Sequence, residues 1–177
     1  MYLKIYLCTN GKTLTISDKG LKAGNIAEYN IGSTAWNTDV SRGDFPAGSN
    51  KCNVFCGEVL TQAGASPGEP NLINPGRSKL PWVSKKYGPP LAGQWADPNY
   101  SIDGWQVLKA GESPRRGDVA SYSFNYSDAS GHVAIVLKNG FTVGTSGSQN
   151  QIAKTAFGFD SSLSNGQSIV FRRYIGK

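Results

Sequence analysis

The clearest periodic pattern of hydrophobic positions begins near Lys51 and ends before Gly64. Apolar side chains recur there at intervals of three and four, at Cys52, Phe55, Cys56, Val59, Leu60 and Ala63. This spacing places them along one stripe of an amphipathic helix. Ser49 or Asn50 can cap its N-terminus, and Gly64 suits the C′ position. The pattern predicts a helix that carries Cys52 in its first turn, on the face that meets the core.

The second half of the chain has the alternation and turn signals of β-structure. Strands are predicted over residues 119–124, 132–138, 141–145 and 169–175. The continuous apolar run in the second of these indicates burial on both faces of a sheet. Asn139-Gly140 is a strong hairpin signal between the second and third strands. A helix followed by an antiparallel meander predicts an α+β domain.

The first residues of the chain follow neither pattern. Residues 1–24 are predicted to form a short strand or hairpin that turns at Asn10-Gly11, and we expect them to be an accessory extension. The expected core covers residues 32–175, and residues 32–50 are predicted to be a loop. Because Asn10 and Lys12 directly follow the apolar start, the sequence predicts a strand there and no signal peptide.

A loop-rich insert lies between Pro67 and Pro98, which contains seven of the nine prolines. A short helix is expected around residues 91–96. Long loops in compact domains are often functional, so this one is expected to form a wall of a substrate groove. The alternative is that its aromatic residues, Trp82, Tyr87 and Trp95, pin the loop to the core.

Composition supports a single globular domain. The chain has 177 residues, of which 38% are hydrophobic and 17% charged, which argues against general disorder. No apolar run approaches the roughly 18 residues that a membrane span needs. The net charge of +6 comes from dispersed lysines and arginines. Such a surface favours solubility and weak attraction to polyanions, including nucleic acid and bacterial cell wall.

The three cysteines, Cys8, Cys52 and Cys56, cannot all pair within one chain. Cys52 and Cys56 lie four positions apart on the predicted helix, which is a poor geometry for a disulfide. A zinc site would require a further ligand, but the chain has no CxxC motif and a single histidine. The sequence therefore predicts no metal and no cofactor.

The chemistry that these residues support is that of a thiol hydrolase. A cysteine reacts as its thiolate, which the N-terminus of a helix stabilises at Cys52. His132 is the only histidine and opens a predicted buried strand, so any histidine base must be His132. It would take the thiol proton and return it to the leaving amine. The backbone N–H of Cys52 is expected to be one donor to the oxyanion. The alternatives are a buried core thiol, which we assign to Cys56, and a buried core histidine.

The imidazole also requires a group that fixes its orientation. A two-residue turn at Asn139-Gly140 would place Thr145 on the face of His132, and the Thr145 hydroxyl is the predicted orienting group. A bulge would substitute Ser146. A slipped register that brings in Gln149 or Asn150 remains an alternative.

Three blocks of sequence, in this order, resemble the NlpC-type and CHAP-type cysteine peptidases and amidases of bacterial cell wall. The blocks are Asn50-Lys51-Cys52-Asn53-Val54-Phe55, Pro114-Arg115-Arg116-Gly117-Asp118-Val119 and Gly131-His132-Val133-Ala134-Ile135-Val136. The resemblance implies a papain-like α+β core, with Cys52 as nucleophile, His132 as base and cleavage of amide bonds in peptidoglycan stem peptides. The polar third residue of the family would fall near Gly144, and residues before 25 have no clear counterpart.

The stretches around Trp95 and Trp105, and the end of the chain from Phe171 to Tyr174, are similar to amidase effectors of type VI secretion. This similarity implies an antibacterial toxin with a cognate immunity protein, although a phage lysin would also fit. Such a protein is made in the cytoplasm without a signal peptide and acts in the periplasm or cell wall of a target bacterium.

Two other functions remain open. A thiol acyltransferase on the same fold would use the same two residues but exclude water. A non-catalytic module would bind cell wall or nucleic acid through its basic and aromatic surface. Only residues 171–174 interleave aromatic and basic side chains in the way that RNA binding favours, so no nucleic-acid partner is expected. Because the sequence has no apolar run long enough to span a bilayer, no membrane insertion is expected either.

Overall fold

The computed structural model describes residues 8–9, 12–13, 18–70, 87–126, 129–138, 140–156 and 168–176. Three helices lie in these segments: α1 (Asp18–Tyr29), α2 (Cys52–Gln62) and α3 (Ala92–Ala96). The strands are β1 (Cys8–Thr9), β2 (Lys12–Thr13), β3 (Trp105–Val107), β4 (Val119–Ser123), β5 (Gly131–Val136), β6 (Phe141–Ser146), β7 (Gln151–Ala156) and β8 (Val170–Tyr174).

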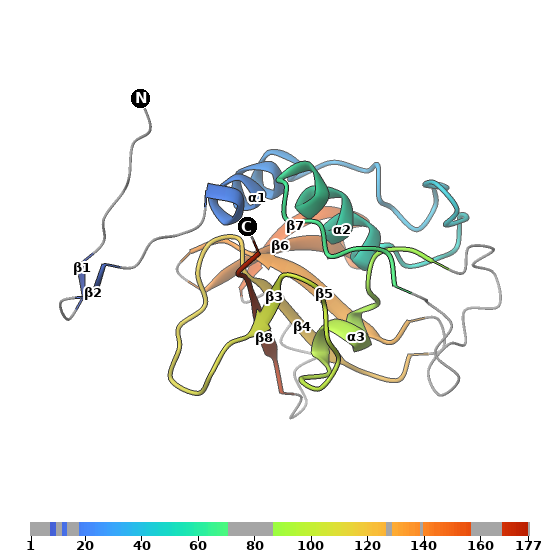
Figure 1. Ribbon diagram of the computed structural model, residues 1–177. Helices are drawn as coiled ribbons and strands as arrows, with labels where there is room; N and C mark the ends of the chain where they lie inside the picture. The colour runs from blue at the N-terminus through green and yellow to red at the C-terminus, as the bar shows by residue number, and fades with distance from the viewer. Residues whose placement is uncertain are drawn as a thin grey trace.

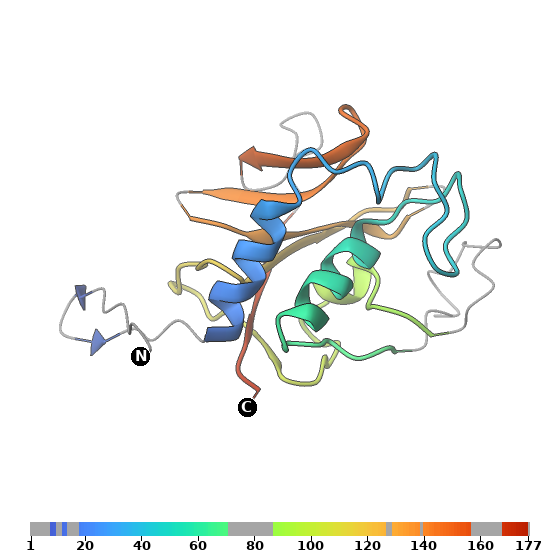
Figure 2. The ribbon, with the colours of Figure 1, turned by 90° about the horizontal axis from the view of Figure 1, so that it is seen from above.

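The main sheet has the strand order β3-β8-β4-β5-β6-β7, and all its neighbouring strands are antiparallel. Helices α1 and α2 lie side by side against it, as Figures 1 and 2 show from two directions. Helix α3 packs against β4, β5 and β8. A helix followed by the meander β4 to β7 confirms the predicted α+β fold. Strands β3 and β7 were not predicted, because β3 has only three residues and Ile152 is the only large apolar residue of β7.

Helix α2 forms where the apolar stripe predicted it. Its residues Phe55, Cys56 and Leu60 are fully buried in the hydrophobic core. Burying an apolar side chain of the size of Phe or Leu contributes about 1.5–3 kcal/mol, so the stripe favours both the helix and its docking. Gly64 follows the helix with φ +82°, a conformation that favours glycine and ends the helix as predicted. No helix in the described segments is long and apolar enough to cross a membrane.

Helix α1 belongs to the core and begins at Asp18, inside the segment of residues 1–24 that was expected to be an accessory extension. Ala23 and Ala27 of this helix are fully buried, and α1 packs against α2, β5 and β6. The contact uses small residues, which leave little hydrophobic periodicity in the sequence. Gly117 shows how close the approach is, because a Cβ at this position would collide with the backbone of Gly20. The β1–β2 hairpin across residues 10–11 is as predicted.

The loop-rich insert is described at its two ends, up to residue 70 and from residue 87, so Trp82 lies outside the described residues. The short helix expected around residues 91–96 is α3. Its Trp95 is buried and packs edge-on against Trp105, with ring centroids 5.0 Å apart. Trp95 therefore pins this end of the insert to the core, whereas Tyr87 is exposed.

Candidate functional site

Cys52 is the first residue of α2 and borders a small pocket that opens to solvent. The walls come from three parts of the chain: the loop before α2 with Asn50, the end of the insert with Leu91 and Ala92, and the start of β5 with Gly131. The insert therefore contributes a wall of the pocket, as its length and prolines predicted. A cysteine in the first turn lies where the unpaired N–H groups of the helix favour negative charge.

His132 is the second residue of β5, the strand on which α2 packs. The residue before it, Gly131, lines the same pocket as Cys52. Burial lowers the pKa of His132 to about 4, because a charged imidazolium is poorly solvated there. The imidazole is therefore neutral at physiological pH and has a nitrogen that can accept a proton. The fold thus places the predicted cysteine at the lining of this pocket and the predicted histidine one residue after the lining residue Gly131.

Tyr122 is a site residue that the sequence did not single out. It lies directly opposite His132 in the β4–β5 ladder, and it is buried. Its hydroxyl forms a hydrogen bond of 3.0 Å with the hydroxyl of Tyr126. Burial, the bond to Tyr126 and, to a lesser extent, negative charge on Cys52 all raise the pKa of Tyr122.

Cys56 lies one turn further along α2 and is fully buried. Burial, followed by the charge of Cys52, raises the pKa of the Cys56 thiol well above its ordinary value. Neither Cys52 nor Cys56 forms a disulfide bond. A thiol that stays protonated is a weak nucleophile, so Cys56 has the properties of a core residue.

The N-cap residue of α2 is Lys51, which has no side-chain cap hydrogen bond, and Asn50 contacts the helix start from one position earlier. Its Oδ1 accepts a hydrogen bond of 3.0 Å from the backbone N–H of Cys52. Ser49, the alternative cap, donates its hydroxyl proton to the carbonyl of Pro46. The Cys52 N–H, which was predicted to be one donor to the oxyanion, is engaged by Asn50 in the absence of substrate.

The predicted orienting group, Thr145, lies on the other face of the sheet from His132. Ile135 pairs with Val143, so the hairpin has a three-residue turn and its register differs by one residue from the predicted one. Such a shift exchanges the two faces of a strand. Ser146, the alternative that a bulge would have introduced, therefore shares the face of His132.

The two remaining alternatives for the orienting group lie in the turn between β6 and β7. The backbone N–H of Gln149 donates to the Ser146 hydroxyl, and the side chain of Asn150 donates to Asp39 at 2.6 Å. In the described segments, no group of three or more His, Cys, Asp or Glu residues could hold a metal ion.

A buried lysine fixes the loop that leads into α2. Lys51 is 1% exposed, and its ammonium donates to the carbonyl groups of Asn37, Pro46 and Ser49 at 2.9–3.2 Å. Burial lowers its pKa, which nearby Asp39 partly opposes. All three ammonium hydrogens thus have acceptors, and the loop is tied to the residue that precedes Cys52.

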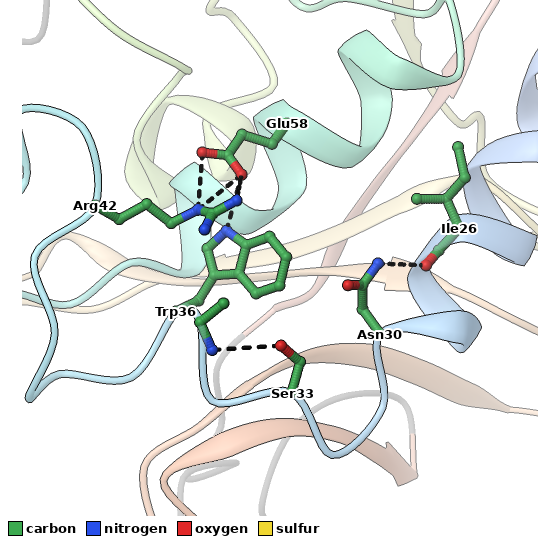
Figure 3. Close-up of polar contacts among 7 residues, drawn as sticks. Ile26, Asn30, Ser33, Trp36, Arg42 and Glu58 are labelled. Carbon is green, nitrogen blue, oxygen red and sulfur yellow. Dashed lines mark hydrogen bonds and ion pairs between the residues drawn. The ribbon is translucent and has the colours of Figure 1, made fainter.

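A second set of polar contacts joins the same loop to the side of α2 (Figure 3). Glu58 of α2 accepts hydrogen bonds from the guanidinium of Arg42 at 2.6–3.0 Å and from Trp36 Nε1 at 3.1 Å. The guanidinium also stacks over the Trp36 ring, 4.1 Å from its centroid. Because the loop is held at Lys51 and at Arg42, the pocket wall that contains Asn50 has a defined position beside Cys52.

Comparison with known protein families identifies the family to which this chain belongs. A family model described as the CHAP domain matches residues 46–149, which include both Cys52 and His132. No curated protein matches this chain.

Several solved structures have a similar fold. One is NlpC1 from Trichomonas vaginalis, with a TM-score of 0.51, 13% identity, and coverage of 94% of this chain and 48% of that protein. This chain therefore spans about half the length of NlpC1. A mutated form of the resuscitation promoting factor interacting protein RipA and a hypothetical invasion protein of Mycobacterium tuberculosis each have a TM-score of 0.51 and 16% identity, over 98% of this chain and 72% of theirs. The likeness confirms the papain-like α+β core.

Proposed function

Because the chain belongs to the CHAP domain family, a group of papain-like cysteine peptidases and amidases of bacterial cell wall, we propose that it cleaves amide bonds in the stem peptides of peptidoglycan. The observation that carries this proposal is the pocket that Cys52 shares with Gly131, the residue before His132. Cys52 begins α2 at this pocket, and His132 follows the lining residue Gly131 on β5, the strand on which α2 packs.

In the first half of the reaction, neutral His132 takes the proton of the Cys52 thiol. The thiolate attacks the amide carbonyl carbon, a C–S bond forms, and the π-electron pair moves to oxygen as an oxyanion. Collapse of this intermediate breaks the C–N bond. The leaving amine takes the proton from the His132 imidazolium, and an acyl group remains on Cys52 as a thioester.

In the second half, water attacks the thioester and gives its proton to His132. A second oxyanion collapses, the C–S bond breaks, and the carboxylic acid leaves while Cys52 recovers its proton. The net reaction is amide plus water to amine plus acid, so it requires no cofactor. An acyltransferase would follow the same first half and then transfer the acyl group to another acceptor.

The biological setting that we propose is attack on the wall of another bacterium, as an antibacterial effector or a lysin. The chain would be made in the cytoplasm and act in the periplasm or cell wall of the target. A cognate immunity protein that fills the pocket beside Cys52 would protect the producer. The segments around Trp95 and Phe171 support the effector alternative through their similarity to type VI amidases.

The test is digestion of purified sacculi followed by mass spectrometry of the released muropeptides. We expect new amine and carboxyl ends at one stem-peptide bond with the wild-type protein, and none with Cys52→Ala. Sacculus binding measured on the same samples should persist in this variant. Equal release by both proteins would exclude Cys52 as the nucleophile, and binding without any release would leave a binding module as the better description.

A further inference from the structure

The pocket beside Cys52 contains polar side chains whose hydrogen bonds can be followed individually. Ser49 and Asn53 donate to backbone carbonyl groups, at 2.6 and 3.2 Å respectively. Ser130 accepts from a backbone N–H at 2.9 Å. Asn50 is the polar side chain that binds directly to the backbone of the nucleophile. Its amide is therefore the group to consider where charge develops next to Cys52.

The bond between Asn50 and Cys52 fixes which end of the amide faces which way. A backbone N–H can donate only to the amide oxygen, so Oδ1 is turned toward Cys52 and Nδ2 lies on the other branch of the amide. Asn50 is one of the residues that line the pocket, and the two N–H groups of its Nδ2 are donors that no acceptor in the described segments engages.

The oxyanion needs such a donor. It forms on the carbonyl whose carbon becomes bonded to the Cys52 sulfur, so its position is set by Cys52 and the groups that border it. The backbone N–H of Cys52 is already engaged by Asn50, so using it would break this bond. A donor from another pocket-lining group next to Cys52 would leave the bond in place.

We propose that Asn50 is a catalytic residue whose Nδ2 donates a hydrogen bond to the oxyanion, a role that rests on the proposed hydrolase function. The two ends of one amide then have separate tasks. Oδ1 holds the start of α2, and this fixes the direction in which Nδ2 points. A donor held in place before the reaction stabilises the transition state without reorganisation, and loss of one such donor commonly lowers kcat by about 10²–10³.

Two substitutions separate these tasks. Asn50→Asp keeps an oxygen that accepts the Cys52 N–H but has no donor for an oxyanion, whereas Asn50→Ala removes both. Asn99→Asp makes the same change in charge at an exposed turn outside the pocket and serves as the control. The kcat and KM for a soluble stem peptide are measured for each protein. The rate of alkylation of Cys52 by iodoacetamide is measured from pH 5 to 9, because alkylation forms no oxyanion and reports the thiolate alone.

We expect Asn50→Asp to lower kcat about 10²–10³-fold with little change in KM. At a pH where the thiol of each variant is fully ionised, alkylation should stay within about threefold of wild type, and Asn99→Asp should match wild type throughout. The proposal is overturned if kcat falls only in proportion to the alkylation rate, which would indicate a purely structural contact, or if Asn50→Asp retains wild-type kcat. Absence of turnover in the wild-type protein, with Cys52 still alkylated, would instead reject the hydrolase function itself and this role with it.

Discussion

The ring of Tyr122 lies opposite that of His132 across the β4–β5 ladder, with centroids 6.2 Å apart and the planes inclined at 43°. The two side chains leave the same face of neighbouring strands, and the Tyr122 hydroxyl is held by Tyr126. Because a cross-strand pair restricts both side chains, Tyr122 limits the positions that the His132 imidazole can take.

This relationship predicts different effects for two changes at Tyr122. Tyr122→Ala removes a buried ring and should lower the free energy of unfolding by about 3–5 kcal/mol, with a large loss of turnover because His132 is less confined. Tyr122→Phe keeps the ring and should cost about 1 kcal/mol, with turnover within roughly tenfold of wild type. Urea unfolding and stem-peptide kinetics measure both. An activity loss as large in Tyr122→Phe as in Tyr122→Ala would show that the hydroxyl, and not the ring, is the important group.

The two cysteines of α2 should differ in reactivity. Cys52 lies at the helix start and at the pocket, whereas burial raises the pKa of Cys56. Iodoacetamide at about pH 6 to 7 should therefore label Cys52 first, as peptide mapping would show. Cys56→Ser should cost about 1–3 kcal/mol of stability and leave substantial activity, while Cys52→Ser should abolish hydrolysis. Preferential labelling of Cys56 would reverse the two roles.

Removal of the His132 imidazole should eliminate turnover without unfolding the protein. His132→Ala is expected to lower kcat by at least a thousandfold, on the scale seen when a member of a catalytic unit is removed. The double variant with Cys52→Ala should be little worse than either single variant, because both residues act in one step. Circular dichroism controls for folding. A His132→Ala protein that retains a tenth of wild-type kcat would exclude His132 as the base.

The stability of the fold should depend on pH through His132. Its pKa is about 4 in the folded protein, against an ordinary value of 6.5, so between these values the unfolded chain binds a proton that the folded protein does not. The contribution of neutral His132 to the free energy of unfolding is fully present above pH 6.5 and is lost as pH falls toward 4. At pH 5 the loss should be about 2 kcal/mol relative to pH 7.

Urea unfolding at pH 7 and pH 5 measures this effect. Cys52→Ala serves as the background, so that the thiol does not contribute. The Cys52→Ala, His132→Gln double variant should lose about 2 kcal/mol less than this background, since every other titrating group is common to both proteins. The same pH dependence in both proteins would mean that the folded-state pKa of His132 is close to its ordinary value.

The sequence by itself determined the elements whose signals are local. The apolar stripe from Cys52 to Ala63 gave α2 with its nucleophile candidate in the first turn, and Gly64 gave its end. The apolar run after His132 gave β5. The order of these elements was sufficient to predict the α+β class. Cys52 and His132 could be selected because each is marked by its own residue type and by its place at the start of an element.

Tertiary structure decided what depends on contacts between distant segments. Helix α1 is held by close packing of small side chains, which gives no strong periodicity, and the pairing of Tyr122 with His132 depends on the β4–β5 register. One extra residue in the turn before Phe141 moved Thr145 to the opposite face of the sheet, because side chains alternate with a period of two. The engagement of the Cys52 N–H by Asn50 depends on a loop whose position is set by hydrogen bonds of Lys51 and by the contact of Arg42 with Glu58. Local sequence patterns do not encode these relationships, since each is decided by which surfaces meet when the chain packs.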